Sequence, residues 1–219
     1  PYYGTVDKTD IFKMNGVNDE YLGTSRLGNA VAYISPNFNG FTAKVAMITD
    51  GGVTSVATTG DSGADGFNVS LDYNNGPLSV GVSHLSLNND KNSAFDGALW
   101  GIAGKYNFGN FAVIGQYENA DKEAWNTLKT TGGYWAGTAT AAAETADVDA
   151  YSIAAEAYFG NNTIRAKYGE IDKATDLETW AIGVQHAFSK RTSVYAEFEN
   201  TESGTSDTDR FGIGMYHTF

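Results

Sequence analysis

The chain has 219 residues, 26 glycines and no cysteine, and its 26 acidic side chains outnumber the 14 basic ones to give a net charge of −12. The lack of cysteine excludes a disulfide-stapled fold and a thiolate zinc site. The acidic balance, without any basic cluster, argues against a nucleic-acid partner, because affinity for nucleic acid comes from neutralising phosphates with Lys and Arg.

From residue 27 onward, apolar and aromatic residues recur at every second position, which is the period of a β-strand with one apolar face. No run of about 18 apolar residues predicts a membrane-spanning helix. Strands can nevertheless cross a membrane as a closed barrel, because their backbone groups pair with one another. We predict eleven strands, near residues 27–36, 40–50, 66–74, 77–87, 97–107, 110–119, 149–159, 162–171, 178–188, 192–202 and 209–219.

The connections between these strands alternate between tight turns and longer polar loops. An up-and-down meander with one smooth and one ragged rim is typical of an outer-membrane barrel. The predicted tight turns are Pro36 to Gly40, Asn74 to Pro77, Asn107 to Asn110, Gly160 to Asn162 and Ser189 to Thr192. The predicted long loops are Asp50 to Asp65, Asn88 to Asp96, Ala120 to Val148, Asp172 to Leu177 and Ser203 to Asp209.

Aromatic residues gather at strand ends rather than at strand centres, where a sandwich core would place them. Amphipathic rings favour the headgroup level of a bilayer, so two belts indicate two membrane interfaces. Beside the tight turns lie Phe38, Phe41, Tyr73, Tyr106, Phe108, Phe111, Phe159 and Phe188. Toward the long loops lie Phe67, Tyr117, Tyr151, Tyr168, Trp180, Phe198 and Phe211.

Charged residues occupy the other face of the same strands. In the strand near 162–171 we expect Ile164, Ala166 and Tyr168 to face lipid, and Arg165 and Lys167 to face the barrel interior. A wide barrel of about 16 strands encloses an aqueous channel, so inward charges would line a path for ions. The predicted pore-lining residues are Lys44, Asp72, Lys105, Glu156, Arg165, Lys167, Glu197, Glu199 and Arg210.

Two segments resemble the general-diffusion porins of Gram-negative bacteria. Residues 26–41, Arg-Leu-Gly-Asn-Ala-Val-Ala-Tyr-Ile-Ser-Pro-Asn-Phe-Asn-Gly-Phe, look like the strand and turn that follow the constriction loop of these proteins. The end, Gly-Met-Tyr-His-Thr-Phe at 214–219, is similar to their terminal strand. The resemblance implies a transmembrane antiparallel β-barrel of 16 strands, located in the outer membrane and trimeric.

Because eleven strands is an odd number and single-chain bacterial barrels have even numbers, we interpret the sequence as the carboxy-terminal portion of such a porin. Residues 1–26 then correspond to the remaining part of the inward-folded constriction loop, and residues 27–219 to barrel strands. The implied constriction charges are Asp7, Asp10, Asp19, Glu20 and Arg26. The acids of this segment outnumber its bases, which predicts a weakly cation-preferring pore.

The resemblance also implies partners. The alternating Phe211, Ile213, Met215 and Phe219 are expected to be the signal read by the barrel-assembly machinery. Other expected partners are outer-membrane lipid and lipopolysaccharide, two further copies of the chain, and the small hydrophilic solutes that pass through. Loop acids offer oxygen ligands for Ca²⁺ or Mg²⁺, but no cofactor is required. These acids are Asp121, Glu123, Glu144, Asp147 and Asp149.

Other readings of the sequence are weaker. The Gly-Asp-Ser-Gly run at 60–63 echoes a serine-protease motif, but none of His84, His186 and His217 has a catalytic context, so we predict no enzyme. The histidines lack metal-ligand spacing. The alternative from another class is a soluble all-β carbohydrate-binding module whose aromatic residues stack on sugar rings.

Overall fold

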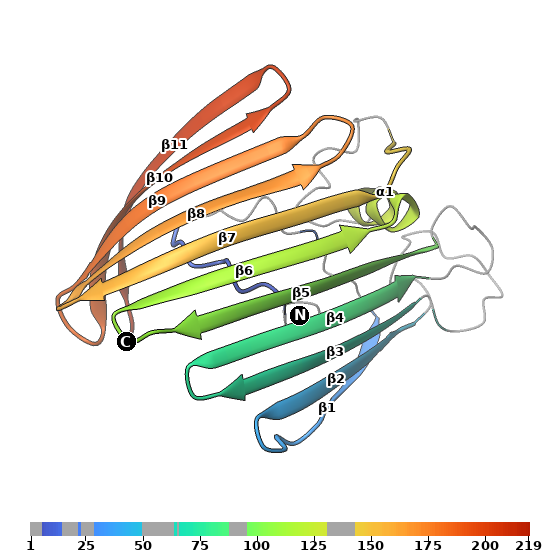
Figure 1. The fold of residues 1–219 in the computed structure, drawn as a ribbon, viewed down its shortest axis with the longest axis horizontal. Coiled ribbons are helices and arrows are strands. Elements are labelled where there is room, and N and C mark those ends of the chain that lie inside the picture. Colours follow the sequence, from blue (N-terminus) through green and yellow to red (C-terminus); the bar gives the residue numbers. More distant parts are fainter. Residues whose placement is uncertain are drawn as a thin grey trace.

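The computed structural model describes residues 6–14, 22, 29–49, 64, 66–87, 96–130 and 143–219. Within them the chain forms one antiparallel up-and-down sheet in which every strand pairs with its sequence neighbours, in the order β1 to β11 (Figure 1). The strands are β1 Ala30–Ile34, β2 Phe41–Ile48, β3 Gly66–Asn75, β4 Leu78–Leu87, β5 Gly97–Asn107, β6 Phe111–Ala120, β7 Val148–Phe159, β8 Asn162–Asp172, β9 Leu177–Ala187, β10 Thr192–Ser203 and β11 Ser206–His217.

All eleven predicted strands are present, and each end lies within three residues of its predicted position. One predicted connection is wrong. Instead of a long loop from Ser203 to Asp209, β10 and β11 stay paired up to Ser203 and Ser206 and are joined by a two-residue turn. Gly204 has a φ of +61° there, which is the left-handed conformation that two-residue hairpin turns require. The sequence prediction failed because the strand ends carry polar residues on both faces.

A helix, α1 Lys122–Thr130, follows β6 within the segment that we predicted as a polar loop. Asp121 caps it: the Ala124 amide donates to one carboxylate oxygen at 2.8 Å, which is the N-cap bond that favours helix initiation. The other carboxylate oxygen accepts the Ala98 amide at 2.6 Å. One side chain therefore starts the helix and ties it to β5.

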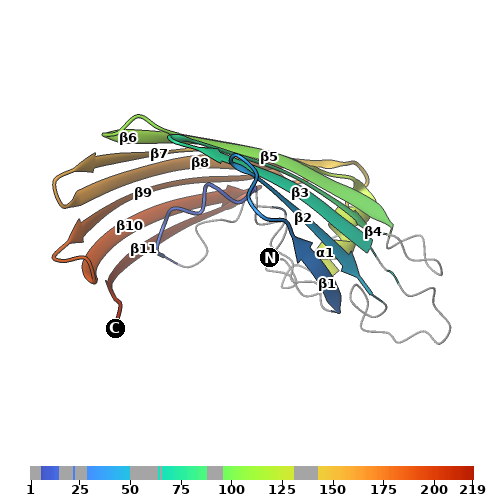
Figure 2. The same cartoon turned by 90° about the horizontal axis from the view of Figure 1, so that it is seen from below.

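The sheet is strongly curved, and the inner segment 6–14 and α1 both lie on its concave side (Figure 2). The tight turns of the other hairpins lie at one rim of the sheet, the turn side, and α1 and the β8–β9 and β10–β11 connections lie at the other rim, the loop side (Figure 1). The helix in the described residues is not long and apolar enough to cross a membrane. The sheet therefore has one convex and one concave surface.

Candidate channel-lining face

Strand β8 shows how the alternating sequence distributes side chains between the two surfaces. Ile164 and Tyr168 are 40% and 39% exposed, whereas Arg165 and Lys167 are 8% and 4% exposed. Ala166 shares the exposed side. Because neighbouring strand residues point to opposite faces, the two basic side chains lie on the concave face, opposite Ile164, Ala166 and Tyr168.

A group of polar side chains gathers on the concave face toward the tight turns. The Glu156 carboxylate on β7 accepts from the Lys105 ammonium at 2.6 Å and from Arg165 Nε at 3.3 Å. The Tyr158 hydroxyl donates to the same carboxylate at 2.8 Å. Arg165 also donates through Nη2 to Gln185 at 2.7 Å. One carboxylate thus serves two cations, which leaves a local excess of positive charge on this part of the wall.

A second ion pair joins Lys44 on β2 to Asp72 on β3 at 2.6 Å. The inner segment brings Lys8 into the same neighbourhood. Burial lowers the pKa of Lys8 below its ordinary value of 10.5, while the charge of Asp72 raises it and that of Lys44 lowers it. This mixed group of charges lies where the inner segment meets the wall.

Hydrogen bonds fasten the inner segment to strands far away in the sequence. The Thr9 hydroxyl donates to Gln116 on β6 at 3.1 Å and accepts from Ser152 on β7 at 3.0 Å. Farther along, the Leu22 amide donates to Glu118 at 2.9 Å. Glu118 is fully buried. Sequence reasoning missed Gln116, Glu118 and Ser152, because a polar residue at an inward position looks the same whether it meets water or another chain segment.

Glu197 and Glu199 of β10 both point to the concave face but have different partners. Glu197 accepts backbone N–H groups of the inner segment, from Lys13 at 3.0 and 2.9 Å and from Met14 at 2.6 Å. Glu199 instead forms an ion pair with Arg210 on β11. Both carboxylates are buried, with 1% and 0% exposure.

Toward the longer connections, the concave face is apolar rather than charged. In β4 the outward apolar residues are Val80 and Val82, but the last two apolar residues, Leu85 and Leu87, point inward and are buried. This change of phase within one strand is the sequence signal that could have revealed an inner cluster. Its members are Val6, Leu22, Ile48, Leu85, Leu87, Leu99, Ala103, Ala120, Trp125, Val148, Ala150, Ile171 and Leu177.

The convex face carries the aromatic belts. On the loop side, rings on paired strands lie directly opposite each other, and from one pair to the next the position shifts by two residues toward the tight turns. A shift of about 6.8 Å for every 9.6 Å across the sheet gives a strand tilt of roughly 35°, which lies within the range of outer-membrane barrels. When tilted strands carry a belt of rings that is level with the membrane plane, the rings lie on a diagonal relative to the strands, as they do here. The pairs are His84–Trp100, Tyr117–Tyr151, Tyr168–Trp180 and Phe198–Phe211.

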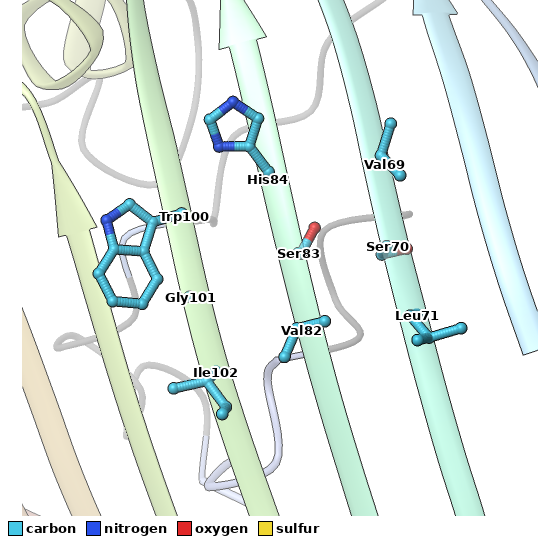
Figure 3. Close-up of a pocket in the computed structure, with 9 residues that line it drawn as sticks. All are labelled: Val69, Ser70, Leu71, Val82, Ser83, His84, Trp100, Gly101 and Ile102. Atoms are coloured by element: carbon cyan, nitrogen blue, oxygen red, sulfur yellow. The ribbon is translucent and has the colours of Figure 1, made fainter. Parts of the chain in front are cut away.

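A shallow groove of about 400 Å³ lies on the convex face between β3, β4 and β5 (Figure 3). Val69, Leu71, Val82 and Ile102 line it, and Trp100 and His84 stand at one end. His84 is the one titratable group among its lining residues, so the groove lacks the paired acid and base that hydrolytic catalysis needs.

The other predicted site residues fall into three groups. Asp7 is half-buried and Asp10 is exposed, whereas Asp19, Glu20, Arg26 and the 60–63 motif lie outside the described residues. Phe211, Ile213, Met215 and Phe219 of the predicted assembly signal are 69%, 74%, 68% and 104% exposed. In the part of the chain that the structure describes, no three acidic or histidine side chains are grouped to hold a metal ion.

The chain belongs to the Gram-negative porin family, because the sequence model of that family matches residues 2–206. Its localisation is the bacterial outer membrane, and its fold is a transmembrane β-barrel fold. These findings leave the soluble carbohydrate-binding alternative without support. No curated protein sequence matches the chain.

Solved structures share the fold at low sequence identity. The anion-selective porin from Comamonas acidovorans superposes with a TM-score of 0.65 at 16% identity, over 100% of this chain and 66% of that protein. OmpT of Vibrio cholerae with loop L8 deleted gives 0.63 at 16% identity, over 99% and 73%. A porin refined at 1.8 Å gives 0.60 at 20% identity, over 86% and 60%. The chain therefore spans just under two thirds of the length of the Comamonas porin.

Proposed function

We propose that the full-length protein forms a water-filled channel for the passive diffusion of ions and small hydrophilic solutes. The observation that carries this proposal is the contrast between the two faces of one sheet. The convex face is apolar and belted with aromatic rings, while the turn-side part of the concave face holds ion-paired Lys105, Glu156 and Arg165. Such a wall stabilises water and ions on one side and lipid on the other.

Residues 1–26 act in this proposal as part of a constriction loop. Support comes from residues 6–14 and 22, which lie against the concave face and bond to Gln116, Glu118 and Glu197. A segment held inside a barrel narrows the water path, and charges in a narrow, low-dielectric passage act strongly on passing ions.

The channel prefers cations weakly. Residues 1–26 offer Asp7, Asp10, Asp19 and Glu20 against Lys8, Lys13 and Arg26. Asp10 is exposed, so its carboxylate is available to an ion. On the wall the charges of the two signs are nearly balanced, which keeps the preference small.

Planar-bilayer recordings of the full-length protein test both statements. Discrete current steps are expected after insertion, and their absence would contradict the channel proposal. Under a KCl gradient, the reversal potential should indicate a weak cation preference that increases at low salt. Neutralising Asp7, Asp10, Asp19 and Glu20 together should reduce it, and a clear anion preference of the unmodified protein would overturn it.

We further propose that the protein acts as a homotrimer, is inserted by the barrel-assembly machinery through its terminal strand, and contacts lipopolysaccharide at its loop side. The loop acids would meet Ca²⁺ or Mg²⁺ bound to the lipid phosphates. Chelation by EDTA should then release lipopolysaccharide from the purified protein, and retention after EDTA would contradict the divalent bridge. No catalytic activity is part of this function.

A further inference from the structure

The tip of the described inner segment meets the wall at one buried carboxylate. Glu197 is 1% exposed and accepts three N–H···O contacts from two successive backbone amides, those of Lys13 and Met14. Hydrogen bonds to an ionised acceptor are about twice as strong as neutral ones. Removing this acceptor would leave both amides without the partner that they have in the structure.

Glycines shape the wall beneath this contact. A methyl group at Gly183 of β9 would lie 2.7 Å from Cγ of Glu197 and 3.2 Å from the Phe12 ring. A methyl group at Gly212 of β11 would lie 2.8 Å from the Met14 sulfur. Neither glycine has a left-handed backbone conformation in the structure, so their role is to allow close approach.

Apolar contacts complete the attachment. The Phe12 ring is 6% exposed and packs in one cluster with Ala181 of β9, and Ile11 and Met14 pack against this cluster. Residues 11–14 therefore pack against β9, β10 and β11, where they contact small residues and a single carboxylate.

We propose that Glu197 is a positioning residue that fixes residues 11–14 against β9, β10 and β11 and so sets the width of the water path. This role rests on the proposed channel function, because the segment constricts only a barrel that conducts. Glu197 acts through the inner segment and not as a charge exposed to passing ions. Loss of its side chain should therefore widen the path and make it fluctuate.

The first test measures position without measuring conduction. The chain has no cysteine, and an added Cβ at Gly212 would lie 3.7 Å from Cβ of Met14, within the range of about 3.5–4.5 Å for disulfides. The double substitution Met14→Cys and Gly212→Cys in the full-length protein should therefore form a disulfide readily on mild oxidation. Adding Glu197→Ala should reduce the rate of its formation several-fold, and an unchanged rate would overturn the positioning role.

Glu199→Gln is the matched control for this test. It removes a buried carboxylate from the same strand and the same face, one that forms an ion pair with Arg210 of β11. It should leave the rate of disulfide formation unchanged. An equal slowing by Glu199→Gln and Glu197→Ala would show a general disturbance of β10 and would overturn the specific role of Glu197.

The second test measures the channel. Glu197→Ala, or the milder Glu197→Asp if the first variant folds poorly, should raise single-channel conductance by roughly half and increase open-channel noise. The disulfide in the Glu197→Ala background should restore the lower conductance, and a reducing agent should reverse this. Conductance and noise equal to those of the unmodified protein would overturn the control of width by Glu197. A protein that forms the disulfide but never conducts would instead contradict the proposed function.

Discussion

The two ends of the concave face are built from the same strands but have opposite chemistry. On β5, Leu99 near the loop-side end is fully buried in the apolar cluster with Val6 and Trp125. Six residues along the same face, the Lys105 side chain is 32% exposed and pairs with Glu156. An inward position is therefore packed core at one end of the strand and part of a partly exposed, ion-paired face at the other.

This difference indicates that the polarity of an inward-facing residue depends on which part of the chain packs against it. Val6, Leu22 and Trp125 cover the loop-side end, and the residues below them are apolar because close packing excludes water there. At the turn-side end the strands carry charges that pair with one another. We expect substitutions at the two ends to have correspondingly different costs.

The largest effect is expected at the packed end. Leu99→Ala should lower the free energy of unfolding by about 2–5 kcal/mol, since it removes a fully buried side chain and leaves a cavity. Lys105→Ala, on the same strand and face, should cost about 1 kcal/mol or less because its ion pair is partly exposed. Urea unfolding of the full-length protein in detergent micelles, followed by tryptophan fluorescence, measures both. Equal losses would contradict the division into a packed end and a wet end.

The second prediction compares the concave face with the convex one. Ala166→Arg places a charge on the lipid side of β8 and should cost about 2–4 kcal/mol near the bilayer midplane. Lys167→Ala changes the buried, concave side of the same strand and should cost less. Folded yield in lipid vesicles, read from the shift in gel mobility on heating, compares the two. If both substitutions reduce the yield equally, the assignment of the convex face to lipid is wrong.

The strands were predictable from sequence because period-2 alternation in β3, β7 and β8 directly records which side faces lipid. The ion-paired wall was partly predictable, since Lys105, Glu156 and Arg165 stand at inward positions of predicted strands. The sequence could not predict that Lys105 and Arg165 share the Glu156 carboxylate, because this contact depends on how the strands from β5 to β8 pair.

Two features could not be predicted by this reasoning. The helix α1 has only nine residues, a length at which an isolated helix is marginal in water, and it is started by a side chain, Asp121, that also bonds to β5. The attachment of Lys13 and Met14 to Glu197 joins residues more than 180 positions apart. No local pattern encodes a contact of that range.

The third prediction concerns pH and the junction between the two ends. Burial lowers the pKa of Lys8 from 10.5 in the folded protein, so the unfolded chain binds more protons at alkaline pH than the folded one does. Stability should therefore rise as pH increases toward 10.5, because the cost of burying the charge is relieved. The unfolding free energy of the unmodified protein, minus that of Lys8→Met, should therefore increase as the pH rises toward 10.5. A decrease in this stability difference with rising pH would contradict the lowered pKa of Lys8 and the burial that causes it.

The smallest effect on stability is expected at Phe219, which belongs to neither end of the concave face. Its ring is fully exposed and contacts His217 edge-on, with a centroid distance of 4.9 Å. Deleting Phe219 should change the unfolding free energy in detergent by no more than about 0.5 kcal/mol, as for other exposed sites. Under the proposed role of the terminal strand as an assembly signal, the folded yield in cells should nevertheless fall clearly. Equal losses in cells and in detergent refolding would indicate that Phe219 contributes packing at the edge of β11 and not a signal.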